Sequence, residues 1–283
     1  MMKKLLVFLF TLISISQAAM ADITVLVHGF LGSPTSWERS HISEQLEAAG
    51  WNRAGVIFQT PQGAMLHQPP AQIAGNEIYS VVLPSRAPLM FQADQLHNMI
   101  SDLEKRHVDE DIVIIGHSAG GVVARAKLVK FGAGNVKKLI TIASPHSGTG
   151  LALYALNKTH GSGPFGVVKS IFGGEKYHIA RSSTGLLLDL VPPHPGSMLF
   201  WLNQQPHPAI EYVSIVRGES IHRNGDDIVP GHSQDMNNVP ALRGKSQLYF
   251  LPTEHSLNPL DGDFLSLLLE DNLQQSVEKD PGK

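Results

Sequence analysis

Short runs of apolar residues recur along the chain at lengths typical of β-strands, and several contain no polar position. A strand that is apolar on both faces is buried on both sides, which is typical of a parallel sheet covered by helices. The predicted strands are Ile23–Val27, Gly55–Gln59, Ile78–Leu83, Asp111–Ile115, Lys137–Ile142, Glu211–Arg217 and Gln247–Leu251.

Segments with helical periodicity lie between these runs, at Thr35–Ala49, Leu89–Arg106 and Gly120–Phe131. Within the second segment, apolar residues recur every three or four positions and define one buried face. This face consists of Leu89, Ala93, Leu96, Ile100 and Leu103. Alternating strands and helices form parallel βαβ units with right-handed crossovers. The sequence therefore predicts an α/β fold, with a mostly parallel sheet and helices on both faces.

Two stretches do not fit this alternation. The segment from Thr60 to Glu77 is rich in Pro, Gly and Gln, and we expect it to cross over the top of the sheet. The segment from Ser147 to Pro208 is far longer than an ordinary connection of 2–6 residues around one helix. Its apolar clusters predict a mostly helical cap insertion at about 147–208, over the active site. The same clusters are equally compatible with a segment that only completes the core.

The chain begins with the features of a secretory signal peptide. Lys3 and Lys4 precede an apolar stretch of about half the ~20 residues that span a membrane, and Ala19-Met20-Ala21 follows it. This pattern predicts a signal peptide over 1–21, cleaved before Asp22, and an uncleaved membrane anchor is the alternative. We see no linker or repeat within 22–283 and predict one exported domain, periplasmic or secreted.

Composition narrows the classes of function. The formal net charge of −3 becomes −5 when the two leader lysines are removed, so nothing favours nucleic-acid binding. The chain has no cysteine, which excludes disulfides and a lipid-attachment cysteine. No H-E-x-x-H, paired-cysteine or Asp-rich calcium-loop spacing occurs, so we predict no metal and no cofactor.

The most informative motif is Gly116-His117-Ser118-Ala119-Gly120, which has a predicted strand before it and a predicted helix after it. In a G-x-S-x-G turn of this kind, the serine backbone is strained and the glycines let neighbouring chain pass closely. The context favours Ser118 as a nucleophile. The alternative is an ordinary glycine-rich turn.

A serine nucleophile requires a base and a carboxylate that orients the base. Asn224-Gly225-Asp226-Asp227-Ile228-Val229-Pro230 follows one late strand, and Pro252-Thr253-Glu254-His255-Ser256 follows the last. We predict Ser118, Asp226 and His255 as nucleophile, acid and base, all at the carboxyl ends of strands. Asp227 is the alternative acid, and His222 and His232 are weaker candidates for the base.

Acyl transfer also requires an oxyanion hole, made of two backbone N–H groups aimed at the developing negative charge. We predict Ala119, directly after the nucleophile, as one donor. The other is Phe30, in the Gly-containing turn after the first strand, with Gly29 permitting the turn. His28 is interpreted as a structural residue beneath the hole, and His117 as support for the serine turn.

Together these segments resemble the α/β-hydrolase superfamily, and within it secreted bacterial lipases and the GPI-inositol-deacylase-like group. The resemblance is carried by the segments Leu26-Val27-His28-Gly29-Phe30, Gly116-His117-Ser118-Ala119-Gly120-Gly121, Ile140-Thr141-Ile142-Ala143-Ser144-Pro145-His146 and the loops of Asp226 and His255. It implies an α/β-hydrolase fold with a Ser-His-Asp site that needs no cofactor. Some such lipases have a disulfide and a calcium site, and this sequence provides neither.

The sequence favours a lipase or esterase that cleaves carboxylic esters with an apolar acyl group through an acyl-serine intermediate at Ser118. We expect a small-molecule or lipid ester as substrate, and transient contact with lipid surfaces. A phospholipase or an acyltransferase would use the same intermediate. An amidase or peptidase, and a non-catalytic binding protein that retains the fold, are the remaining alternatives.

Overall fold

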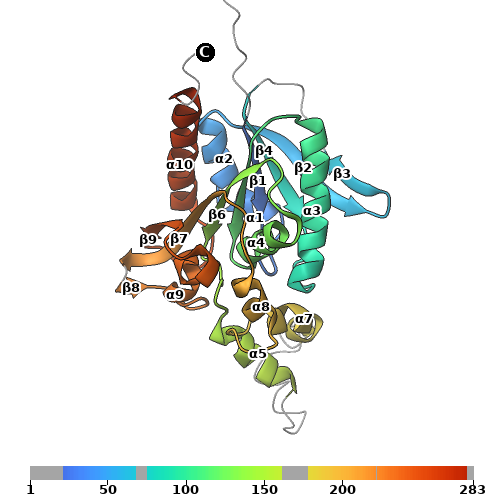
Figure 1. Ribbon diagram of the computed structural model, residues 1–283, viewed down its shortest axis with the longest axis vertical. Coiled ribbons are helices and arrows are strands. Elements are labelled where there is room, and N and C mark those ends of the chain that lie inside the picture. The colour runs from blue at the N-terminus through green and yellow to red at the C-terminus, as the bar shows by residue number, and fades with distance from the viewer. Residues whose placement is uncertain (1–21, 68–74, 161–177, 221, 279–283) are drawn as a thin grey trace, which may run out of the picture.

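The computed structural model describes residues 22–67, 75–160, 178–220 and 222–278, so the predicted signal peptide lies outside the described residues. In this part of the chain, nine strands form one sheet in the order β3-β2-β4-β1-β5-β6-β7-β8, with β9 paired to β7 (Figure 1). The strands are β1 (Ile23–Val27), β2 (Asn52–Thr60), β3 (Gly63–His67), β4 (Glu77–Val82), β5 (Ile112–His117), β6 (Val136–Ile142), β7 (Glu211–Ser220), β8 (Arg223–Asn224) and β9 (Ser246–Leu251).

All seven predicted strands form, and they pair in parallel along the centre of the sheet. Strand β1 lies between β4 and β5, β6 lies between β5 and β7, and β9 follows β7. The strands β1, β5 and β6 have fully buried or nearly fully buried sequences, as their continuous apolar runs predict. The prediction of a mostly parallel sheet is confirmed.

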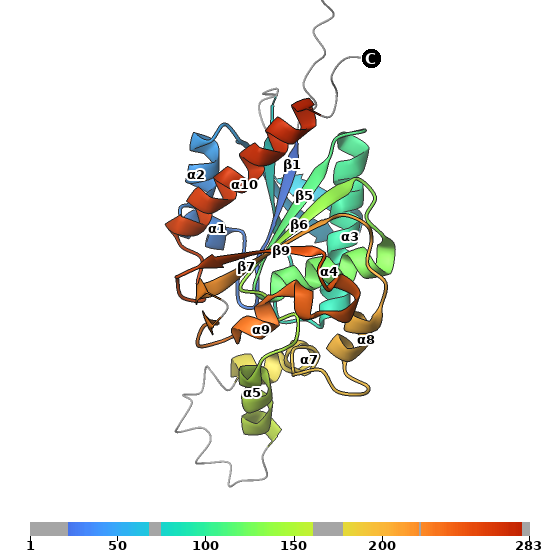
Figure 2. The ribbon, with the colours of Figure 1, turned by 60° about the vertical axis from the view of Figure 1, so that its left-hand side comes forward.

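Helices cover both faces of the sheet. They are α1 (Thr35–Arg39), α2 (Ile42–Ala48), α3 (Leu89–Arg106), α4 (Ala119–Phe131), α5 (Gly150–His160), α7 (Thr184–Asp189), α8 (Met198–Gln204), α9 (Gly231–Gln234) and α10 (Pro259–Glu278), with short 3₁₀ turns at Met236–Asn238 and Pro240–Leu242. Figure 2 shows α3 and α4 on one side, and α1, α2 and α10 on the other.

Two apolar cores lie between the sheet and these helix layers. Successive side chains of β1 alternate between them: Val25 and Val27 enter the core under α3 and α4, and Leu26 enters the core under α2 and α10. Burying one large aliphatic side chain contributes about 1.5–3 kcal/mol to stability. The sheet therefore receives stabilisation from both faces, and its strand ends are held in fixed relative positions.

Helix α3 has the predicted bounds and buries the five predicted apolar positions. The predicted helix at Thr35–Ala49 is instead two helices, α1 and α2, because the backbone at His41 has a φ of 61°. A left-handed residue cannot continue a right-handed helix. Helix α10, which the sequence analysis did not predict, packs on α2 and buries Leu265 and Leu269.

The expected crossing over the sheet from Thr60 to Glu77 is wrong for the residues that the structure describes there. Strands β2 and β3 form an antiparallel hairpin, with Gln59 opposite Ala64. Pro61-Gln62 forms the turn and Gly63 has a φ of 127°, which a residue with a side chain rarely adopts. The Pro and Gly content marks a hairpin turn that adds a strand at the edge of the sheet. Residues 68–74 lie outside the described residues.

The described part of the predicted cap contains α5, α7 and α8, which lie beyond the carboxyl end of the sheet (Figure 1). Leu186 of α7 and Leu199 of α8 are fully buried in the core under α3 and α4. Helix α5, by contrast, exposes Leu151, Leu153 and Tyr154. Helices α7 and α8 thus contribute to the core, while α5 buries Ala152 and Leu156 and also presents an apolar surface. Residues 161–177 of the predicted cap lie outside the described residues.

A buried polar contact fastens α8 to the centre of the fold. The guanidinium of Arg125, on α4, donates from Nη2 to Asn203 Oδ1 at 2.7 Å, and Asn203 Nδ2 donates to the His146 carbonyl at 3.1 Å. Arg125 is fully buried, and burial lowers its pKa to about 9, so the group is still charged near neutral pH. Within the described chain Arg125 has no carboxylate partner, so amide and carbonyl dipoles compensate this charge.

We expect Asn203→Ala to lower the free energy of unfolding by about 2–3 kcal/mol, because it removes a hydrogen-bond acceptor from a buried cation. Urea unfolding followed by circular dichroism measures the loss. The matched control is Asn238→Ala, an exposed asparagine bonded only to a backbone carbonyl. Its effect should stay within about 0.5 kcal/mol. Equal effects of the two variants would contradict the role assigned to the Arg125 contact.

Candidate active site

Ser118 lies at a sharp reversal between the end of β5 and the start of α4. Its φ of 52° and ψ of −129° are values that a residue with a side chain rarely adopts. The turn is held by the Ser118 N–H, which donates to the Ile142 carbonyl of β6 at 2.8 Å, and by the Gly121 N–H, which donates to the Ser118 carbonyl at 3.1 Å. The hydroxyl therefore stands at the carboxyl edge of the sheet.

The glycines of the motif are required by close approach of the backbone. A Cβ on Gly116 would lie 2.4 Å from the Cα of Gly121, and a Cβ on Gly120 would lie 2.5 Å from the carbonyl oxygens of Val27 and His28. These are clashes with backbone atoms, which cannot rotate away. The sequence pattern G-x-S-x-G is thus the geometric condition for bringing β1, β5 and α4 together at Ser118.

The structure brings the three predicted residues Ser118, His255 and Asp226 into one hydrogen-bonded chain. His255 Nε2 lies 3.0 Å from Ser118 Oγ, and His255 Nδ1 lies 2.9 Å from Asp226 Oδ2. An ionised carboxylate only accepts hydrogen bonds, so the network assigns the imidazole proton to Nδ1. The lone pair of Nε2 then faces the serine hydroxyl. Ser118 follows β5, Asp226 follows the hairpin of β7 and β8, and His255 follows β9, and these strands are near one another in the sheet.

The geometry selects Asp226 rather than Asp227 as the partner of His255. Asp226 Oδ1 accepts hydrogen bonds from the N–H groups of Ile228 and Val229, both at 2.8 Å, while Asp227 is exposed. Burial alone would raise the pKa of Asp226, but the hydrogen bond and charge of His255 and these two N–H groups outweigh it and lower the pKa. The carboxylate is therefore ionised at neutral pH.

Gln234 is a residue of this site that sequence reasoning missed. Its Nε2 donates to Asp226 Oδ2 at 3.0 Å and to the Val229 carbonyl at 2.7 Å, and its Oε1 accepts from the Arg217 N–H at 2.8 Å. The side chain is fully buried. It links the loop of the acid to β7. No sequence signal identifies it, because a glutamine in a short helix belongs to no motif that the chain displays.

A buried ion pair holds the loop of His255 and was also missed. Arg217 and Asp261 are fully buried and form two contacts, of 2.6 and 3.0 Å. Arg217 also donates to the Ser256 carbonyl at 3.3 Å, and Asp261 accepts from the Asn258 N–H at 3.0 Å. The loop that carries His255 is therefore fastened on one side to β7 and on the other to the first turn of α10.

The side chain of His117 contacts the loop of His255. Its Nε2 donates to the His255 carbonyl at 2.9 Å, and the two rings are 5.2 Å apart. Burial, followed by the proximity of His255, lowers the pKa of His117 to about 3. The ring is therefore uncharged at neutral pH. It donates a hydrogen bond and places no positive charge beside His255. The structure shows the side chain of His117 holding the loop of His255, and its support of the serine turn stays a prediction.

The turn after β1 lies directly against Ser118. A Cβ on Gly29 would lie 2.8 Å from Ser118 Cβ and 3.4 Å from Ala119 N. In the part of the chain that the structure describes, the N–H groups of Phe30 and Ala119 donate to no protein acceptor. The two N–H groups that the sequence predicts as oxyanion donors therefore have no acceptor among the described residues, and their role stays a prediction.

His28 fixes this turn from below. Its Nδ1 donates to the Gly29 carbonyl at 3.1 Å, while its Nε2 accepts from the Leu83 N–H at 3.1 Å, at the end of β4. Burial lowers the pKa of His28, so the ring is neutral and in one tautomer. The interpretation of His28 as a structural residue beneath the turn agrees with these contacts. His222 and His232 lie exposed on the surface.

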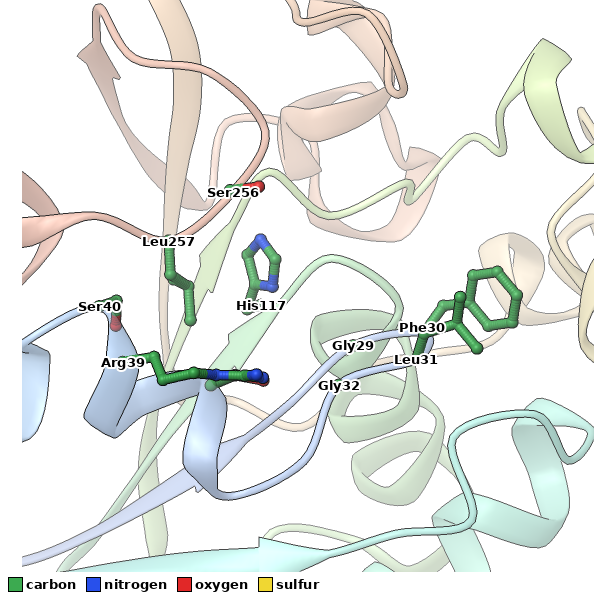
Figure 3. A pocket seen from close by; sticks show the side chains of 10 residues that line it. Gly29, Phe30, Leu31, Gly32, Arg39, Ser40, His117, Ser256 and Leu257 are labelled. Atoms are coloured by element: carbon green, nitrogen blue, oxygen red, sulfur yellow. The ribbon is translucent and has the colours of Figure 1, made fainter. Parts of the chain in front are cut away.

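A cavity of about 330 Å³ adjoins the site (Figure 3). Its lining includes the turn after β1, together with His117 and Ser256, which are chain neighbours of Ser118 and His255. Over the described residues, no group of three or more His, Asp or Glu side chains could hold a metal ion. The same residues contain no helix long and apolar enough to cross a membrane.

Comparisons with known proteins bear on the fold and on part of the sequence. The family model of the PGAP1-like alpha/beta domain matches residues 87–157, which include α3, β5, the Ser118 turn and α4. A segment of 57 residues is 37% identical to the lysosomal thioesterase PPT2 homolog of Drosophila melanogaster. That segment covers 20% of this chain and only 19% of the relative.

Solved structures resemble the chain over most of its length. The product of the gene lin2722 from Listeria innocua has a TM-score of 0.61 at 17% identity, covering 88% of this chain and 94% of its own. A lipase-esterase related protein from Clostridium acetobutylicum gives 0.52 at 14%, covering 88% and 93%. The mature lipase BlEst2 from Bacillus licheniformis gives 0.51 at 15%, covering 90% and 92%. The chain has the α/β-hydrolase fold.

We expect the free energy of unfolding to fall as the pH is lowered from 7.5 to 5.5. Burial lowers the pKa of His117 to about 3 and that of His146 well below its ordinary value, so both rings stay neutral in the folded protein, whereas unfolded imidazoles bind protons near pH 6.5. The unfolded state then binds more protons, and each imidazole removes about 1 kcal/mol of stability over this interval. Asp22, whose pKa burial and Asp111 raise to about 6, acts in the opposite direction below that pH.

Chemical denaturation at several pH values measures this dependence. The variant His117→Gln keeps a neutral side chain with an N–H donor. Its free energy of unfolding should fall by about 1 kcal/mol less between pH 7.5 and 5.5 than that of the wild type. The matched control is His232→Gln on the exposed surface, which should retain the full dependence. Stability that is flat or rises on acidification would contradict the assignment of neutral buried imidazoles.

Proposed function

We propose that the protein is a serine hydrolase that cleaves carboxylic esters with an apolar acyl group. The observation that carries the proposal is the chain of hydrogen bonds from Ser118 through His255 to Asp226, with lengths of 3.0 and 2.9 Å. A nucleophile, a base and an orienting carboxylate in this arrangement are what acyl transfer by a serine requires. The likeness in fold to proteins described as lipases and as lipase-esterase related supports the same class of activity.

The reaction follows from the roles of these groups. Ser118 Oγ attacks the ester carbonyl carbon while His255 Nε2 takes its proton, and Asp226 stabilises the resulting imidazolium. The N–H groups of Phe30 and Ala119 bind the carbonyl oxygen as it becomes negative. The tetrahedral intermediate collapses as His255 protonates the leaving alcohol. Water then attacks the acyl-serine with His255 again as base, which releases the acid and restores Ser118.

The preference for an apolar acyl group is supported by surfaces near the carboxyl edge of the sheet. Leu151, Leu153 and Tyr154 of α5 are about half exposed, as is Leu188 at α7. Exposed apolar residues that gather in one region are typical of ligand or lipid contact. The match to a thioesterase homolog over 57 residues makes acyl thioesters a further substrate to include in assays, since the same acyl-serine would form.

We expect a fluorescent fluorophosphonate to label the purified protein at Ser118, because an activated serine attacks phosphorus as it attacks a carbonyl. Mass spectrometry identifies the labelled residue. Ser118→Ala and His255→Ala should each abolish labelling, while circular dichroism verifies that both variants are folded. Absence of labelling in the folded wild type, with and without detergent micelles, would favour a non-catalytic binding protein.

We expect Asp226→Asn to lower kcat for a p-nitrophenyl ester by on the order of 10³-fold or more, because an amide cannot hold the required imidazole tautomer. Asp227→Asn is the matched control, since it makes the same change on the adjacent exposed residue. It should alter kcat less than about twofold. A larger effect at Asp227 than at Asp226 would contradict the assignment of the acid.

We also propose that the protein is exported and that its leader is removed before Asp22. The proposal is supported by the sequence pattern over 1–21. N-terminal sequencing of the protein recovered from the periplasm or the medium of an expressing bacterium should begin at Asp22. Recovery of the intact leader in the membrane fraction would instead identify an uncleaved anchor.

A further inference from the structure

The cavity beside the site is built from a different part of the chain than the apolar surface of α5 and α7. Its walls come from residues 29–40, from His117 and from Ser256 and Leu257. Figure 3 shows that Phe30 and Leu31 lie at one end of this group, and Arg39 and Ser40 at the other. His117 and Ser256, which line the cavity, are the chain neighbours of Ser118 and His255. The cavity is therefore a separate place for the alcohol portion of an ester whose apolar acyl group lies against α5 and α7.

Arg39 gives this cavity a positive charge. It is the last residue of α1, and its side chain extends along the cavity towards Gly32 (Figure 3). No Asp or Glu belongs to the lining. The whole chain has a formal net charge of −3, whereas the lining of this cavity has one full charge, which is positive. The cavity is thus opposite in charge to the protein overall.

The carboxylates closest in sequence to Arg39 are bound elsewhere. Glu38 and Glu47 both pair with Arg53, at 2.5 and 2.6 Å, and Glu44 contacts His41 at 2.8 Å. The side chain of Arg39 forms no ion pair or hydrogen bond within the described residues. Its guanidinium is thus available to a ligand, unlike that of Arg53.

A hydroxyl group in the lining adds a second donor. Ser36 Oγ accepts a hydrogen bond from the Ser33 N–H at 3.2 Å and keeps its own hydrogen, for which the described residues offer no acceptor. The other lining serine of this helix region, Ser40, already donates to the Trp37 carbonyl at 3.0 Å. Guanidinium and hydroxyl donors together suit the oxygens of a carboxylate or a phosphate.

We propose that this cavity binds an anionic group, a carboxylate or a phosphate, on the alcohol portion of the ester. The inference deepens the proposed function, because it describes the substrate of the same site as an ester with an apolar acyl group and a negatively charged alcohol portion. Arg39 is a specificity-determining residue in this scheme. It has no part in the proton transfers at Ser118 and His255.

The test compares two esters with the same acyl group: 4-carboxyphenyl butyrate, which is anionic, and its methyl ester, which is neutral. We expect the ratio of kcat/KM for the anionic over the neutral ester to fall about tenfold in Arg39→Gln, as for a lost charge-assisted hydrogen bond. Arg39→Lys should retain part of the ratio, and 0.5 M salt should reduce the wild-type ratio. Arg243→Gln is the matched control, because it removes an exposed arginine outside the cavity.

A binding measurement separates this inference from the proposed function. Calorimetric titration of Ser118→Ala with phenyl phosphate and with benzoate should show binding that is weakened about tenfold by adding Arg39→Gln, with benzyl alcohol as the neutral control. The two anions distinguish a phosphate from a carboxylate ligand. Ester hydrolysis with a ratio unchanged in Arg39→Gln would overturn the anion site and leave the hydrolase intact. Arg39-dependent anion binding without any ester hydrolysis would support the site and contradict the proposed function.

Discussion

The structure depends on one backbone reversal, at Ser118. The chain leaves β5 and enters α4 within a single residue. Its φ of 52° is energetically costly for any residue other than glycine. The positions on either side require glycine. A Cβ added at Gly116 or Gly120 would lie only 2.4–2.5 Å from atoms of the neighbouring backbone. Helix α4 is buried along most of its length. Its packing, together with that of β1 and β6 against the turn, fixes the reversal and the position of the Ser118 hydroxyl.

Around this reversal, polar side chains position the loops while the sheet positions the strand ends. Gln234 orders the loop of Asp226, Arg217 and Asp261 order the loop of His255, and His117 joins that loop to the serine turn. A buried ion pair is a weak source of net stability, because desolvation offsets much of the attraction. Its value here is geometric, since it holds a carbonyl of the His255 loop in place.

Much of the fold could be predicted because the sheet is parallel and buried, so each strand is visible as an apolar run. The site residues Ser118, Asp226 and His255 could be predicted because they follow such runs in a fixed order. The hairpin of β2 and β3 could not be predicted, because β3 is short and half exposed. The Pro and Gly residues around it favour a loop. Gln234 and the pair of Arg217 with Asp261 could not either, because their role arises from contacts between segments distant in sequence.

The attachment of the His255 loop to α10 makes the position of the base depend on a helix distant from the serine turn. Asp261 lies in the first turn of α10, which packs on α2, and its partner Arg217 belongs to β7. The serine turn is held separately, by its hydrogen bond to β6. A change in how α10 packs on α2 therefore reaches the loop of the base through one ion pair and leaves the serine turn in place.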